Sequence, residues 1–139
     1  MSISKADRQL VINRAKECCE YCRLPANAGT VEFHIDHIIP RKHDGTDTID
    51  NLCFACFHCN LYKSHDLTGF DPETGEISRL YHPRNQVWGE HFKIVTESLV
   101  TGKSSEGRTT VNVLKMNLEE RVESRQVLAD IDEYPCEDA

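Results

Sequence analysis

The stretch FHIDHIIPRKHDGTDTIDNLCFACFHCNLYKSH, residues 33–65, decides the fold of this chain. It opens with Asp36 and His37, a carboxylate beside an imidazole, and it closes with a C-x2-C pair directly followed by Asn60. An imidazole that accepts a proton, next to oxygen ligands for a cation, is typical of metal-assisted chemistry. A C-x2-C pair is half of a tetrathiolate zinc site. This one stretch therefore predicts two different kinds of metal chemistry.

Seven cysteines are many for a chain of 139 residues. They are Cys18, Cys19, Cys22, Cys53, Cys56, Cys59 and Cys136. The N-terminus is charged and lacks the apolar segment of a signal peptide, and no apolar run approaches the roughly 20 residues that span a bilayer. We therefore expect a cytoplasmic protein with reduced thiols and no membrane partner. In a reducing compartment, such a pattern favours metal binding over disulfides.

Two C-x2-C pairs separated by a few tens of residues supply four thiolates, which bind zinc tetrahedrally. The register is open, because Cys18 and Cys53 lie close to these pairs. We choose four ligands for one structural Zn2+: Cys19, Cys22, Cys56 and Cys59. The choice rests on Cys59, which directly precedes Asn60, and on Cys53, which reads as an apolar strand residue. The cysteines left as ordinary free thiols are Cys18, Cys53 and Cys136.

Periodicity and turn residues predict the elements of the first half. These are a helix over residues 4–17, strands over 31–39 and 52–55 that pair as an antiparallel ribbon, and a helix from 57 to about 65. Ser4 and Asp7 form a capping pair at the start of the first helix. Strict alternation would place Asp36 and His37 on opposite faces of the first strand, so they serve one site only if the strand bends or ends there. Pro40 allows such an end.

The second half is less regular. The predicted elements are a hairpin around residues 70–77, a strand over 92–100 broken near Ser98, a loop over 101–107, one helical turn over 111–114, and a helix over 118–130 opened by a capping box of Asn117 and Glu120. The expected organisation is α+β. Residues 1–69 would form a zinc-clamped core with an N-terminal helix, residues 70–130 a β-hairpin and helix extension packed on it, and residues 131–139 an acidic disordered tail.

The motifs resemble those of the HNH endonucleases, which read as D-H-I-x-P, then N-L, then C-x2-C-N-x2-K. Here these segments are residues 36–40, 51–52 and 56–63. The resemblance covers residues 19–63. It implies a ββα-metal core with a structural zinc site of four cysteines, and an enzyme that hydrolyses DNA phosphodiester bonds.

The resemblance also implies a role for each motif residue. His37 would be the general base that activates water. Asp36 and Asn60 would hold a catalytic Mg2+ or Mn2+, cations that prefer hard oxygen donors. Asn51 would be the structural middle residue of the catalytic motif, with its amide hydrogen-bonded to the backbone of the loop before it. His34, two residues before Asp36, is a further candidate ligand.

Three basic residues are candidates for contact with phosphate: Lys63, Arg41 and Lys42. The charge balance limits this role, because the net charge is −7 and residues 1–65 carry eight Lys and Arg against eight Asp and Glu. Without a basic stripe, tight non-specific DNA binding is not expected. DNA is the predicted partner, and a protein partner or a homodimer would supply additional affinity.

Two other interpretations compete with an autonomous nuclease. A zinc-stabilised nucleic-acid-binding or scaffold module without catalysis needs none of Asp36, His37 and Asn60, so their joint presence favours the enzyme. A nuclease subunit that depends on a partner for DNA binding fits the acidic charge. Trp88 is more consistent with a core residue than with a platform for base stacking.

Overall fold

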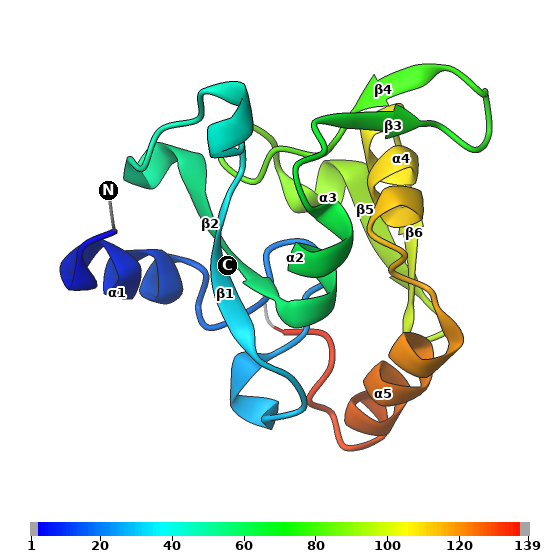
Figure 1. The fold of residues 1–139 in the computed structure, drawn as a ribbon. Helices are drawn as coiled ribbons and strands as arrows, with labels where there is room; N and C mark the ends of the chain where they lie inside the picture. Colours follow the sequence, from blue (N-terminus) through cyan, green and yellow to red (C-terminus); the bar gives the residue numbers. More distant parts are fainter. Residues whose placement is uncertain (1–2, 137–139) are drawn as a thin grey trace.

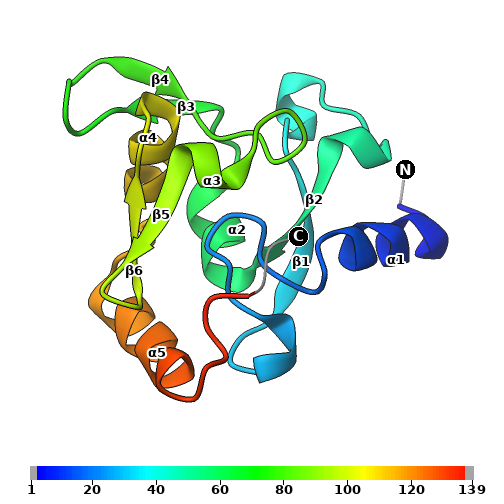
Figure 2. The same ribbon diagram turned by 180° about the vertical axis from the view of Figure 1, so that it is seen from behind.

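The computed structural model describes residues 3–136, within which the chain forms three two-stranded antiparallel sheets and five α-helices (Figures 1 and 2). The helices are α1 (Lys5–Arg14), α2 (Phe57–Lys63), α3 (Trp88–His91), α4 (Ser105–Val113) and α5 (Glu119–Asp130). The strands are β1 (Phe33–His37), β2 (Leu52–Cys56), β3 (Thr68–Phe70), β4 (Ile77–Arg79), β5 (Phe92–Val95) and β6 (Leu99–Gly102). No helix in this range is long and apolar enough to cross a membrane.

The first half contains the predicted ββα unit. β1 pairs with β2 in antiparallel register, α2 follows β2 directly, and α2 contacts both strands (Figure 1). The predicted cap of α1 is confirmed, because the Ser4 side chain accepts a hydrogen bond from the Asp7 backbone N–H at 3.0 Å. α1 ends at Arg14, earlier than predicted, because Lys16 and Glu17 adopt positive φ angles of 55° and 57° that no helix continues.

The second half contains the predicted hairpin, in which β3 pairs with β4, and Phe70 lies opposite Ile77. The long strand expected over 92–100 is a second hairpin, β5–β6, because Thr96 and Glu97 have positive φ angles and reverse the chain. The loop predicted over 101–107 is wrong. α4 begins at Ser105, since the Ser104 side chain accepts from the Gly107 backbone N–H at 3.0 Å and caps the helix.

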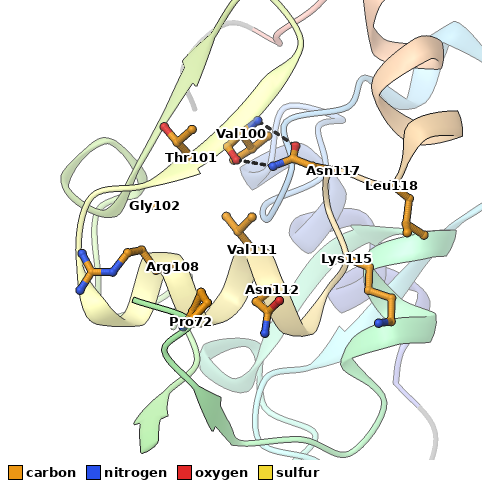
Figure 3. Close-up of a pocket in the computed structure, with 10 residues that line it drawn as sticks. All are labelled: Pro72, Val100, Thr101, Gly102, Arg108, Val111, Asn112, Lys115, Asn117 and Leu118. Carbon is orange, nitrogen blue, oxygen red and sulfur yellow. Dashed lines mark hydrogen bonds between the residues drawn. The ribbon is translucent and has the colours of Figure 1, made fainter. Parts of the chain in front are cut away.

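The predicted capping box at the start of α5 is also wrong. Asn117 directs its amide away from the helix to the edge strand β6, where it accepts from the Val100 N–H at 3.1 Å and donates to the Val100 carbonyl at 2.8 Å (Figure 3). α5 follows Leu118, which has no side-chain cap. The backbone groups at the edge of β6 bind the Asn117 side chain, so it is not available to cap α5. Local sequence spacing cannot predict such a long-range partner.

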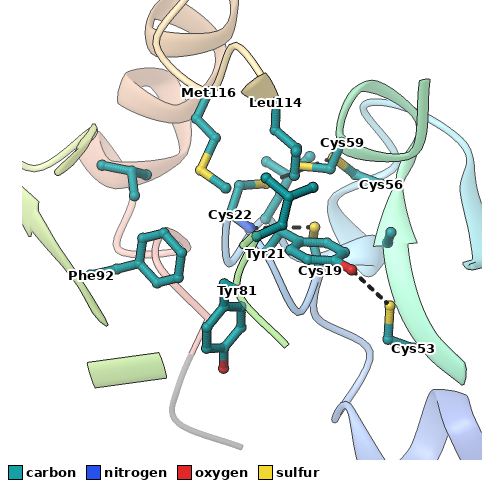
Figure 4. Packing of buried hydrophobic residues seen from close by; sticks show 14 of the residues in the cluster. Cys19, Tyr21, Cys22, Cys53, Cys56, Cys59, Tyr81, Phe92, Leu114 and Met116 are labelled. Atoms are coloured by element: carbon teal, nitrogen blue, oxygen red, sulfur yellow. Dashed lines mark hydrogen bonds between the residues drawn. The ribbon is translucent and has the colours of Figure 1, made fainter. Parts of the chain in front are cut away.

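The main core cluster combines the two cysteine pairs with residues from the second half of the chain. It contains the four predicted zinc ligands together with large side chains: Tyr21, Tyr81, Phe92, Leu114 and Met116 (Figure 4). Residues from both predicted parts, 1–69 and 70–130, therefore share one buried cluster. The division into a core over residues 1–69 and an extension over residues 70–130 stays a prediction.

The segment after α5 departs most from expectation. Tyr134 is 5% exposed, and its hydroxyl donates to the Cys22 carbonyl at 2.7 Å. Cys136 forms a disulfide with Cys18. The expected disorder is therefore wrong for residues 131–136, and Cys18 and Cys136 are not free thiols. In this acidic segment, the side chains of Tyr134 and Cys136 contact Cys22 and Cys18, which lie in and beside the first C-x2-C pair. The remainder of the expected tail, residues 137–139, lies outside the described residues.

Candidate active site and metal centre

The four thiols predicted to bind zinc come together from two distant segments. The sulfur atoms of Cys19, Cys22, Cys56 and Cys59 all lie within 4.8 Å of one another. Tetrahedral coordination with a Zn–S bond of about 2.3 Å separates the sulfur atoms by roughly 3.8 Å. The distance from Cys22 Sγ to Cys56 Sγ is 3.7 Å. The predicted set of cysteines is confirmed as a group able to hold one metal ion (Figure 4).

Cys53 faces away from this cluster. Three positions separate it from Cys56, so the two side chains leave β2 on opposite faces. Its Sγ donates to the Tyr21 hydroxyl at 3.6 Å (Figure 4). Burial raises the pKa of the Cys53 thiol well above its ordinary value, so the thiol stays protonated. Cys53 is therefore an interior thiol rather than a zinc ligand, as expected.

Arg121 contacts the thiol cluster, and sequence reasoning missed it. It lies on α5, is 5% exposed, and its Nη2 donates to Cys59 Sγ at 3.1 Å. Its Nη1 donates to the carbonyl oxygens of Leu114 and Lys115 at 2.7 Å and 3.0 Å. Four thiolates around Zn2+ carry a charge of about −2, so a buried guanidinium beside them offsets part of it. The surrounding sequence, EERVES, reads as an exposed helix and gives no hint of this contact.

We expect Arg121→Gln to release zinc faster than the wild type. The change leaves Cys59 without its charged donor, and a hydrogen bond to a charged group contributes about 1.5–3 kcal/mol. Zinc transfer to a chromogenic chelator, followed over time, measures the effect. Glu123→Gln, on the exposed face of the same helix, serves as the matched control. Equal release rates for Arg121→Gln and the control would contradict a role for Arg121 at the thiolates.

Asp36, His37 and Asn60, three of the four predicted catalytic residues, line one open pocket of about 390 Å3. The fourth, Asn51, is not among the lining residues. β1 supplies Asp36 and His37 at its end, and α2 supplies Asn60. The remaining lining residues are Pro40, Arg41, Leu61, Ser64 and His65. Asp36 and His37 both border the pocket at the end of β1, where the Asp36 side chain contacts Lys63 and the His37 side chain contacts Asp47.

His37 has a carboxylate partner that sequence reasoning also missed. Its Nε2 lies 2.7 Å from Asp47 Oδ1, and the guanidinium of Arg41 lies 3.0 Å from the same oxygen. The hydrogen bond with His37 holds the pKa of Asp47 below its ordinary value, with Arg41 acting in the same direction. An ionised carboxylate on one ring nitrogen fixes the orientation of an imidazole. The loop also holds Asp44 and Asp50, so spacing alone could not single out Asp47.

Lys63 has a different role from the one expected. It is 2% exposed, and its Nζ lies 3.1 Å from Asp36 Oδ2 and 2.9 Å from the His37 carbonyl oxygen. The ammonium is buried and paired with Asp36, so its position gives no support to the expected contact with phosphate. Lys63 lies one helical turn after Asn60 and turns inward against β1. Burial raises the pKa of Asp36, and the charge of Lys63 opposes that rise.

Asn51 ties the long loop to the end of the ribbon. It is 7% exposed, and its Oδ1 accepts from the Ile39 N–H at 2.9 Å, while its Nδ2 donates to the carbonyls of Ile39 and Thr46 at 2.9 Å and 2.8 Å. These are hydrogen bonds of the kind the sequence predicted for it. The loop passes so close that a Cβ at Gly45 would overlap the Ile39 carbonyl, which explains the glycine.

The other candidates lie at the margin of the pocket or away from it. Arg41 lines the pocket, and its side chain is 55% exposed beside Asp47. Lys42 is exposed and lies outside the residues that line the pocket, as does His34. Trp88 stacks on Phe92 and donates from Nε1 to the Tyr21 carbonyl at 2.8 Å, which suits the expected core residue.

Comparison with known proteins agrees with the motifs. Residues 19–66 match the family model described as HNH endonuclease. No curated protein and no solved structure matches the chain. The matched segment contains the four clustered thiols and all four predicted catalytic residues. At residues 19–66, this chain therefore contains a domain of the HNH endonuclease family, which suggests a nuclease-type function.

Proposed function

We propose that the chain is a metal-dependent endonuclease that hydrolyses phosphodiester bonds of DNA. The observation that carries the proposal is the single open pocket shared by Asp36, His37 and Asn60 within a domain of the HNH family. A binding module would need no such combination of an imidazole with hard oxygen donors in a pocket open to a substrate.

His37 is the general base of this proposal. Its Nε2 is engaged with the ionised Asp47, so the proton resides on Nε2 and the lone pair on Nδ1 is left to accept a proton. A water molecule that loses its proton to Nδ1 attacks phosphorus, and the P–O bond to the leaving 3′ oxygen breaks. The products are a 5′ phosphate and a 3′ hydroxyl. Asp47 stabilises the imidazolium that forms and keeps the ring in place.

Asp36 and Asn60 are the proposed ligands of Mg2+ or Mn2+. A carboxylate oxygen and an amide oxygen, both lining the pocket, fit the preference of these cations for hard donors. When bound there, the cation supplies charge relief at the scissile phosphate and at the leaving oxygen. Lys63 holds one Asp36 oxygen and so orients the carboxylate.

The second metal site has a structural role in this proposal. The four thiols of the cluster are all buried, with at most 1% of each residue exposed, and four protein ligands leave no open position for a substrate. Zn2+ bound by them would join the Cys19/Cys22 segment to the start of α2, the helix that carries Asn60. The zinc would thus fix the start of the helix that supplies Asn60 to the active-site pocket.

Incubation of the purified protein with supercoiled plasmid and Mg2+ or Mn2+ tests the proposed function. We expect conversion of the supercoiled form to nicked or linear DNA, and loss of this conversion when a chelator removes the added cation. An intact plasmid at all metal concentrations, with zinc retained, would contradict a nuclease and would favour a zinc-stabilised binding module.

We expect Asp47→Asn to cleave roughly 10- to 100-fold more slowly, the usual loss when the partner that orients a functional histidine is removed. The reduction should fall on kcat rather than on KM, because Asp47 acts through His37. Single-turnover cleavage of a labelled duplex measures it. Asp44→Asn, in the same loop and exposed, provides the control. Wild-type rates for Asp47→Asn would show that the carboxylate does not position the base.

We expect the isolated chain to bind DNA weakly, with a slope of log affinity against log salt shallower than about −4, since each phosphate contact contributes close to −0.9. The net charge is −7, and the burial of Lys63 removes one cation from the candidate contacts. Titration of the His37→Ala variant measures the slope without cleavage. Nanomolar binding with a slope near −8 would refute this expectation. Weak binding supports a protein partner or a homodimer as the source of DNA affinity.

A further inference from the structure

A second cavity adjoins the active-site pocket. It has a volume of about 620 Å3 and is walled by the end of β1, the end of α2, the β3–β4 hairpin and the loop that follows β4. We infer that this cavity receives one nucleobase of the DNA, turned out of the base stack next to the scissile phosphate. The inference rests on the proposed nuclease function and names how that site selects its substrate.

Consecutive residues at the end of β1 and at the end of α2 line the two hollows. Ile39 lines the cavity, and the next residue, Pro40, lines the active-site pocket. Likewise, Lys63 lines the cavity, and Ser64 lines the active-site pocket. Lys63 forms part of the cavity wall, and its Nζ contacts Asp36 at the edge of the active-site pocket. We therefore place the base of the nucleotide on the far side of Lys63 from the phosphate that lies beside His37.

The floor of the cavity suits the face of a planar ring. It is formed by buried apolar and aromatic side chains: Ile38, Leu80 and Tyr81, which are 5%, 8% and 4% exposed. Enzymes that extrude a base receive it between aromatic or apolar side chains and read its edge by hydrogen bonds. The volume lies in the range of roughly 300–1,000 Å3 that is usual for small-molecule sites.

The rim of the cavity supplies polar groups for the edge of a base. His82 accepts hydrogen bonds at Nδ1 from the backbone N–H groups of Arg84 and Asn85, both at 3.2 Å, so its ring proton resides on Nε2 and is available to donate. Asn85 and Arg79 are exposed side chains that also line the cavity. An amide, a fixed imidazole donor and a guanidinium together offer both donors and acceptors to a heterocycle.

The charge of the cavity favours a base over a phosphate. The lining includes two acidic residues, Asp66 and Glu106, and two basic residues, Arg79 and Lys63. Lys63 is already paired with Asp36, so the wall has no positive excess to hold an anion. A neutral, flat ligand with polar edges matches this balance.

This inference predicts the kind of DNA that is cut best. Unpaired or mismatched bases cost less to turn out than paired ones. Cleavage should therefore be several-fold faster where a mismatch or a single-stranded gap adjoins the scissile bond than in a fully paired duplex.

The test uses 2-aminopurine, whose fluorescence rises when it leaves the base stack. The preferred cut in a duplex is mapped first, and 2-aminopurine is then placed at each flanking position in turn. Ca2+ replaces Mg2+ so that DNA is bound without being cut. We expect a several-fold rise in fluorescence at one position with the wild type. The rise should be lost in the double variant Arg79→Ala/Asn85→Ala and in Thr68→Trp, which fills the cavity from its exposed rim.

Arg8→Ala, a loss of one exposed arginine from α1, is the matched control and should keep the full rise. Zinc content and melting temperature establish that each variant is folded. If the wild type cuts DNA but no flanking position responds, or if the rise survives in both cavity variants, the cavity assignment is overturned while the nuclease stands. If free 2-aminopurine riboside binds and DNA gives no rise, the cavity is a free-nucleoside site and the assignment to the substrate is overturned. If the wild type cuts no DNA, the proposed function itself fails.

Discussion

His37→Ala should abolish DNA cleavage, with a loss of roughly 100- to 10,000-fold, the usual contribution of a general base. The pocket would keep Asp36 and Asn60, yet no group placed beside the attacking water would accept its proton. His37 lies at the end of β1 and belongs to neither hydrophobic cluster among the described residues, so zinc content and melting temperature should be unchanged. Plasmid cleavage, metal analysis and thermal unfolding together measure the effect.

His34→Ala is the matched control for this experiment. It removes another imidazole from the same strand, one whose side chain is 39% exposed and which lies outside the active-site pocket. We expect near wild-type cleavage. If His37→Ala cuts as fast as the wild type, the base is elsewhere, and His34 becomes the next residue to examine.

Cys56→Ser should abolish zinc binding and the cooperative unfolding of the protein. Structural zinc sites have apparent binding free energies of about 10–16 kcal/mol, comparable with the whole stability of a small domain, about 5–15 kcal/mol. Cys56 ends β2 and begins α2, and it lies in the main core cluster, so the loss would reach both elements. Metal analysis of the purified variant and its thermal unfolding curve measure the outcome.

Cys53→Ser provides the comparison, since Cys53 lies on the opposite face of the same strand and contacts Tyr21 instead of the thiol cluster. It should retain one zinc ion per chain and unfold cooperatively. Full zinc occupancy and an unchanged melting temperature in Cys56→Ser would contradict the ligand assignment and would make Cys53 the next candidate ligand.

The order of elements around the candidate site follows from the sequence alone. Local spacing predicts the ββα unit, the two C-x2-C pairs and the motif residues Asp36, His37 and Asn60. It can do so because tetrahedral coordination and the short periods of strands and helices allow few geometries. The zinc register could be chosen from the sequence because Cys59 directly precedes Asn60 and Cys53 reads as an apolar strand residue. In the structure, Cys53 and Cys56 leave β2 on opposite faces. The meeting of Asp36 and His37 in one pocket could be stated only as a condition, and the end of β1 satisfies it.

Only the tertiary structure decided which charges surround the thiol cluster and the candidate active site. Asp47 could not be chosen over its neighbours, because the path of a ten-residue loop depends on where Asn51 and Gly45 hold it. Lys63 and Arg121 read as exposed basic residues, yet each is buried against a distant negative group, Asp36 or Cys59. Likewise, the segment with Tyr134 looked too acidic to fold. The partner of a buried charge or ring lies far away in the chain. Sequence periodicity predicts which face of a helix or strand turns inward, but it does not predict which residues that face contacts.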